Sequence, residues 1–205
     1  MRSVRSRAER SSMHPRYLMP STVAGDESMK RIAFLVAACS AVVGCSTMTP
    51  ARYSVSVDND LILKHYAGKQ LELASMAAPA SFDSTCRLMG PIQGSDNMTI
   101  PQFVQKAFND EFKFAGLYSE NGTKLDGTLD KIEFSSISGF TNGWWDLALT
   151  LKSSNGKSLS TEDKYEFKSG FDAITACNQT AQALGPAVQD LIKKAVSDPE
   201  FQSLL

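Results

Sequence analysis

The residues able to do chemistry are few, and their spacing matches no catalytic or metal-binding motif. Two His and four Cys occur in 205 residues. His65, the only His after residue 45, stands beside Tyr66, and no GxSxG nucleophile motif accompanies it. Acidic pairs such as 110–111 and 162–163 are typical of solvated surfaces, and the sequence has no phosphate loop, GxGxxG or zinc spacing. We therefore predict that the protein is not an enzyme and uses no metal and no cofactor.

A secretory signal that ends in a cysteine is indicated near the N-terminus. Lys30 and Arg31 precede an apolar run over 32–43. As a helix this run rises only about 18 Å, short of the roughly 30 Å hydrocarbon core of a bilayer. The Val-Val-Gly-Cys that follows at 42–45 resembles the lipobox of bacterial lipoproteins. This resemblance implies cleavage before Cys45 and a lipid on Cys45 that anchors the protein in a membrane. The alternative is an ordinary secreted protein with a chance Cys.

The resemblance also divides the chain into segments. Residues 29–44 are the expected signal peptide, 45–53 a lipidated tether and 54–205 a periplasmic domain. Residues 1–28 contain five Arg and no apolar periodicity, and we favour a misplaced start codon over an organellar transit peptide. In bacterial lipoproteins an Asp after the lipidated Cys favours retention in the inner membrane. Because Ser46 stands there, we expect the periplasmic face of the outer membrane.

The mature chain is more acidic than the whole sequence. Cleavage before Cys45 leaves 161 residues and removes seven of 21 Lys and Arg but only three of 22 Asp and Glu. The formal charge therefore falls from −1 to −5. A nucleic-acid partner is not expected, because phosphate binding needs an excess of basic side chains.

Cys86 and Cys177 are the only cysteines left beyond the lipidated position. In an oxidising compartment such a pair predicts a disulfide. The alternative is a redox or catalytic thiol, which the absence of a CxxC motif and of a nearby His in the sequence disfavours.

Trp144 and Trp145 form an unusual pair in a segment of alternating hydrophobicity. Alternation places the two rings on opposite faces of a strand. Trp145 shares its side with Leu147, Leu149 and Leu151 and is expected in the core. Trp144 is a candidate contact residue for a partner or ligand, and the alternative is a ring that caps the edge of the sheet.

Periodicity along 54–205 predicts a single α+β domain. Apolar residues at helical spacing mark two main helices, at 100–115 and 173–196. Ile174 is assigned to the apolar stripe of the second helix, and Pro186 is expected to kink or divide that helix. Alternation predicts strands at 70–76, 124–137, 144–153 and 158–167, with a bulge at 130–131 and room for a short strand at 86–89. We expect a mostly antiparallel sheet of about four strands, with both helices packed on one face.

Several segments between residues 99 and 201 carry a second resemblance. They are the Phe-Val helix, the Gly-Trp-Trp-Asp strand, Ser-Ser-Asn-Gly at 153–156, Ala-Cys at 176–177 and the final Asp-Pro-Glu-Phe. They look similar to small uncharacterised proteobacterial lipoproteins, and some accessory lipoproteins of envelope transport systems have a comparable helix-on-sheet domain. This resemblance implies no activity. We expect a binding or assembly accessory with an envelope protein as partner. The alternative is a carrier of a small apolar ligand or lipid held between the sheet and the helices.

Overall fold

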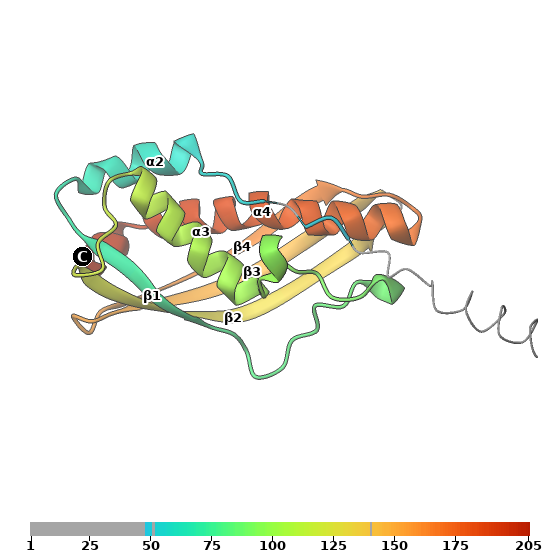
Figure 1. Cartoon of the computed structure of the whole chain (residues 1–205), viewed down its shortest axis with the longest axis horizontal. Helices are drawn as coiled ribbons and strands as arrows, with labels where there is room; N and C mark the ends of the chain where they lie inside the picture. The colour runs from blue at the N-terminus through green and yellow to red at the C-terminus, as the bar shows by residue number, and fades with distance from the viewer. Residues whose placement is uncertain (1–47, 51, 140) are drawn as a thin grey trace, which may run out of the picture. The chain divides into compact units, whose positions relative to one another are not determined.

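In the residues that the structure describes, four strands form one sheet, two long α-helices pack against it, and a shorter α-helix packs on these two helices (Figure 1). This computed structural model describes residues 48–50, 52–139 and 141–205, so Cys45 lies outside the described residues. The strands are β1 (Leu71–Ala77), β2 (Thr123–Ser138), β3 (Asn142–Ser153) and β4 (Ser158–Lys168), and the helices are α2 (Val57–Leu63), α3 (Ile100–Phe114) and α4 (Ala173–Ser197). Short 3-10 helices are η1 (Lys64–Tyr66), η2 (Arg87–Met89), η3 (Ser95–Asn97) and η4 (Pro199–Leu204).

The strands lie in the order β1-β2-β3-β4. β1 runs parallel to β2, whereas β2 with β3 and β3 with β4 are antiparallel. The parallel pair is connected through α3, as a crossover requires, and the last two strands are joined by a tight turn at Asn155 and Gly156. Gly156 has a φ of +87°, a conformation that favours glycine. The predicted single α+β domain with a mostly antiparallel sheet is confirmed.

One face of the sheet forms the core. Trp145 and Leu149 of β3 are fully buried, and the same alternation continues in β2 with Leu125 and Leu129. The indole N–H of Trp145 donates to the carbonyl oxygen of Thr180 on α4, at 2.9 Å. This bond satisfies the polar group of the largest core side chain and positions α4 over the centre of the sheet. The predicted alternation of β3 is correct.

The opposite face of the sheet is polar and partly open to solvent. The Lys131 ammonium lies between the carboxylates of Asp146, at 3.1 Å, and Glu162. These residues come from β2, β3 and β4, so the ion pairs cross three neighbouring strands. A bulge shifts the pairing of β2 with β3 between Leu129 and Lys131, where the sequence predicts it.

Both long helices begin with caps that the sequence supplies. Thr99 and Gln102 form a capping box at the start of α3, and the Asp172 carboxylate accepts from the backbone N–H of Thr175 at 2.8 Å at the start of α4. Buried apolar residues on both helices face the sheet, as expected. Within the described part of the chain, no helix is both long enough and apolar enough to span a membrane.

The structure contradicts the division of α4 at Pro186 and the place of Ile174 in its apolar stripe. Pro186 does not divide the helix, which is continuous from Ala173 to Ser197. Pro186 is exposed and cannot donate a backbone hydrogen bond, while the buried neighbours Leu184 and Val188 hold the helix on the sheet. Ile174 does not join the apolar stripe and is exposed, because the buried part of α4 begins one turn later, at Ala176 and Cys177.

Residues 86–89, where the sequence allows a short strand, form a tight turn instead. The backbone N–H of Met89 donates to the carbonyl of Cys86 at 3.0 Å, and the N–H of Cys86 donates to the carbonyl of Gly90 at 2.9 Å. These bonds curl the chain into η2 and prevent an extended run. Arg87 adopts a φ of +52° within this turn.

A buried carboxylate on α3 holds the N-terminal part of the domain. Oε1 of Glu111 accepts from the hydroxyl of Tyr53 at 2.6 Å, from the backbone N–H of Ser56 at 2.8 Å and from Nδ2 of Asn59 at 3.3 Å. The same Asn59 amide donates to the carbonyl of Gln189 on α4 at 3.1 Å. Glu111 thus joins the segment before α2 to both long helices, and burial raises its pKa above the ordinary value for a glutamate.

The raised pKa of Glu111 predicts a pH-dependent stability difference between the wild-type protein and Glu111→Gln. Between the ordinary glutamate pKa of 4.5 and the higher folded-state pKa, the folded protein binds more protons than the unfolded chain. Wild-type stability, measured by urea unfolding, should therefore fall relative to Glu111→Gln as the pH rises from 4.5. Glu111→Ala is the control. It leaves the three donors unpaired and should lower the free energy of unfolding by about 1–3 kcal/mol. A wild-type-to-Gln difference that is constant from acidic to neutral pH would contradict the assignment.

Candidate functional site: a groove along the free edge of β2

A groove forms where β1 stops and β2 continues. β1 ends at Ala77, opposite Thr128, whereas β2 runs on to Ser138. The loop after β1 passes beside this second half of β2 and leaves a hollow of about 640 Å³. The hollow is lined by Pro79, Ser81, Phe82, Asp83, Thr85, Cys86 and Arg87 of the loop, by residues 130–136 of β2 and by Trp144 of β3. Its volume is within the usual range for binding sites in proteins.

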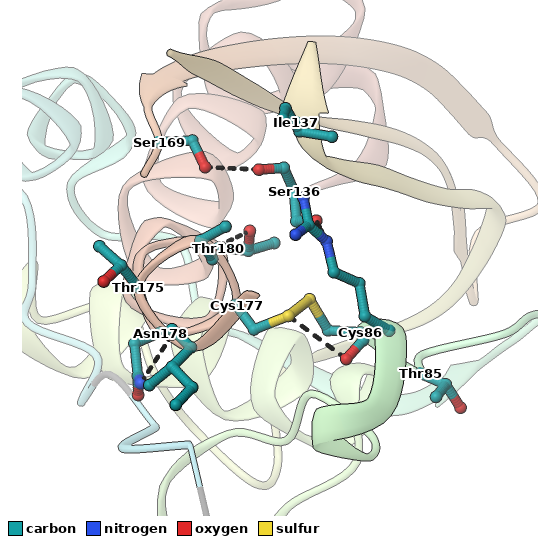
Figure 2. The surroundings of a disulfide bond; sticks show 12 residues. Thr85, Cys86, Ser136, Ile137, Ser169, Thr175, Cys177, Asn178 and Thr180 are labelled. Carbon is teal, nitrogen blue, oxygen red and sulfur yellow. Dashed lines mark hydrogen bonds between the residues drawn. A yellow bond between two sulfur atoms is a disulfide. The ribbon is translucent and has the colours of Figure 1, made fainter. Parts of the chain in front are cut away.

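The loop wall of the groove is fixed to the rest of the domain by a disulfide. Cys86 and Cys177 are bonded, with their Cα atoms 5.8 Å apart, so the predicted bridge is present. Figure 2 shows that it joins the turn of the loop to α4, with Ser136 and Ser169 facing each other nearby. The hydroxyl of Ser169 donates to the carbonyl oxygen of Ser136, which connects the end of β2 to the segment after β4.

Arg87 makes a second connection across the groove. Its Nε–H donates to the hydroxyl oxygen of Ser136 on β2, at 3.1 Å. Arg87 holds the left-handed backbone conformation that is uncommon for a residue with a side chain, and such conformations concentrate at functional sites. The turn, the disulfide and this hydrogen bond keep the loop at a defined distance from the strand.

The backbone of β2 along this groove has no strand partner on the loop side. In the part of the chain that the structure describes, no backbone hydrogen bond joins residues 129–138 to the loop at 78–91. Because β3 occupies only one side of β2, alternate residues of this half point their N–H and C=O groups toward the groove. An edge of this kind is a template for an additional strand.

The charges in the groove leave one acidic group unpaired. Asp130 accepts from the hydroxyl of Thr150 at 2.6 Å, and Lys131 is engaged by its two carboxylate partners. Asp83 accepts from the backbone N–H of Thr85 at 2.8 Å, and this hydrogen bond lowers the pKa of Asp83. Glu133 is exposed and has no hydrogen bond or ion pair among the described residues. The groove therefore presents a free carboxylate at its centre.

Trp144 stands on the outer face of the sheet, opposite in direction to Trp145. It is half-buried, lines the groove, and has the ammonium of Lys164 5.0 Å from its ring centroid. The prediction that the two rings lie on opposite faces is correct. The ring offers an apolar surface next to the charged residues of β2 that line the groove, which is the setting of a contact residue.

The other candidates for chemistry do not gather at one place. His65 is exposed on η1, and its Nδ1 lies 3.1 Å from the carbonyl oxygen of Ile62. Asp110 pairs with Lys106 on the surface of α3. Among the described residues, no three His, Cys, Asp or Glu side chains are grouped so that they could hold a metal ion. Cys45 lies outside these residues.

Sequence reasoning missed most of the groove. Phe82, Arg87, Glu133 and Ser136 lie in a loop or in an ordinary strand, and no motif marks them. A signal was nevertheless present in the strand lengths. The expected strand at 124–137 is twice as long as the expected strand at 70–76. If the two strands pair, half of the longer one has no partner on that side.

Comparisons with known proteins do not identify a family for this chain. No protein-family model and no curated protein matches this sequence. Among solved structures, the chain is similar to protein XCC0632 from Xanthomonas campestris, described as a member of family DUF330, with 16% sequence identity and a TM-score of 0.47. The match covers 76% of this chain and 98% of that chain. The role of the groove is therefore inferred from its own residues.

The two neighbouring tryptophans allow a matched test of the two faces. Trp145→Ala should destabilise the protein by about 3–5 kcal/mol, because it empties a fully buried site and removes the bond to Thr180. Trp144→Ala should cost no more than about 1 kcal/mol, the scale of an exposed cation–π contact. Urea unfolding followed by far-UV circular dichroism measures both. Equal losses in the two variants would show that Trp144 is a structural residue.

Proposed function

We propose that this protein is a non-enzymatic lipoprotein, anchored through Cys45 to the periplasmic face of the outer membrane, that serves as a binding accessory in the cell envelope. The signal at 29–44 and the lipobox-like residues that end at Cys45 support the anchor. The folded domain starts close behind this position, since Met48 is already buried against the core. Such a short connection suits a domain that works at a membrane surface.

The observation that carries the binding role is the free edge of β2 inside a preformed groove. An extended polypeptide that enters the groove can add a strand to the sheet, gaining main-chain hydrogen bonds to the unpaired half of β2. Trp144 and Phe82 would contact its side chains, and the free carboxylate of Glu133 favours a segment that places a Lys or Arg opposite it. The proposed ligand is thus a basic extended segment of an envelope protein.

The location of the groove favours this role over a lipid carrier. A carrier would hold its apolar ligand between the sheet and the helices. The 640 Å³ hollow lies instead at the edge of β2, and its β2 lining includes the charged residues Asp130, Lys131 and Glu133. Polar strand edges recognise peptide backbones better than acyl chains, because acyl chains offer no hydrogen bonds.

Lipidation is tested by the mass of the mature N-terminal peptide. In cells expressing the full chain, we expect a peptide that begins at Cys45 and carries acyl groups. Cys45→Ser should accumulate as an uncleaved precursor without lipid. An unmodified mature N-terminus in the wild-type protein would contradict the anchor and favour ordinary secretion.

The binding role is tested by site-specific photo-crosslinking in the envelope. A photoreactive amino acid at Ser81, an exposed residue of the loop wall, leaves Glu133 in place and should capture a defined envelope protein through one extended segment. The matched position is Lys152, which is also exposed but lies outside the groove. A synthetic peptide of the captured segment should compete at 81, and Glu133→Arg should weaken its binding. Equal capture from both positions, or a peptide that binds Glu133→Arg unchanged, would contradict the proposal.

A further inference from the structure

Three large apolar side chains are exposed around the start of α4. Leu88 is fully exposed, at 102%, and Phe171 and Ile174 are exposed by 74% and 58%. Val57 and Leu61 on α2 and Phe114 on α3 are exposed as well. Single exposed apolar side chains are normal on a protein surface, whereas neighbouring ones mark interaction sites. Leu88, Phe171 and Ile174 do not line the groove.

The disulfide brings the three residues to one end of the domain. Leu88 follows Cys86 by two residues, Ile174 lies one helical turn before Cys177, and Phe171 directly precedes the N-cap of α4. In Figure 1, η2 and the start of α4 lie at the same end of the long axis, where β2 also ends. Leu88 therefore lies at the same end of the domain as Phe171 and Ile174, although they are 83 and 86 residues away in the sequence. We call these three exposed side chains the apolar end surface.

The chain leading to Cys45 is held at this same end. The backbone N–H of Thr49 donates to Oδ1 of Asn178, at 3.1 Å, and Nδ2 of Asn178 donates to the carbonyl oxygen of Ile174, at 2.9 Å. Thr49 is thus fixed one helical turn from Ile174. Cys45 precedes Thr49 by four residue steps, which span at most about 14 Å when the chain is fully extended. A lipid on Cys45 must enter its membrane close to the apolar end surface.

We propose that Leu88, Phe171 and Ile174 insert into the interfacial region of the membrane that holds the Cys45 lipid, and so set the orientation of the domain. This inference rests on the proposed lipid anchor. Interfacial insertion removes the three side chains from water, and the anchor keeps them at the surface. The long axis of the domain then stands away from the membrane, with α2 at the far end. The groove along the last half of β2 opens on the membrane-proximal side.

Quenching by brominated lipids tests the orientation with two matched variants. Leu88→Trp and Leu61→Trp each place an indole at an exposed leucine position, the second on α2 at the opposite end. Each lipidated protein is reconstituted into vesicles of phosphatidylethanolamine and phosphatidylglycerol with brominated acyl chains. After subtraction of the wild-type emission, the Leu88→Trp signal should be strongly quenched and blue-shifted. The Leu61→Trp signal should be unchanged.

Chemical coupling of a lipid to Cys45 separates the test of orientation from the test of lipidation in cells. In a chain of residues 45–205, the disulfide leaves Cys45 as the free thiol, which can be coupled to a maleimide lipid. If the cell does not acylate Cys45, the proposed function fails, while the coupled protein still reports on the end surface. Equal or absent quenching in the two variants would overturn the orientation. Emission at position 88 that depends on protein concentration, and not on brominated lipid, would assign the surface to self-association and also overturn it.

Discussion

The unequal lengths of the two parallel strands constrain the rest of this fold. β1 covers seven residues and β2 sixteen, so most of β2 has a neighbour on only one side. The chain after β1 must then cross the space beside β2 before α3 can begin. It does so as a loop that is curled at η2 and bonded to α4 through Cys86. The groove, its free strand edge and its fixed outer wall all follow from this mismatch.

Much of the architecture could be predicted because local patterns and long-range packing agree. Trp145, Leu147, Leu149 and Leu151 alternate in the sequence and are all buried, and the apolar stripe of α3 is buried as expected. Asn155 and Gly156 form the turn that their types indicate. The Cys pair was identifiable because only two cysteines follow Cys45 in the sequence. In each case one simple periodicity or one count was sufficient.

The features that escaped prediction depend on contacts between distant segments. Glu111 looks like any helix carboxylate, yet it is buried because Tyr53 and Ser56, 58 and 55 residues earlier, donate to it. Ile174 fits a helical stripe, but its side chain is exposed at the start of α4. Arg87 takes a backbone conformation that its residue type does not suggest, because the turn around it is closed by Cys86 and Gly90. The unequal lengths of the two strands indicated the groove, whereas no residue type or spacing marked the residues that line it.

The disulfide makes the outer wall of the groove depend on the redox conditions around the protein. The loop after β1 and α4 are covalently connected only where the two cysteines, 91 residues apart in the sequence, are oxidised. Where cellular reductants maintain thiols, this connection is absent, and the Arg87 hydrogen bond to Ser136 still joins the loop to β2. The oxidation state of one bond therefore decides how firmly the outer wall of the groove is held.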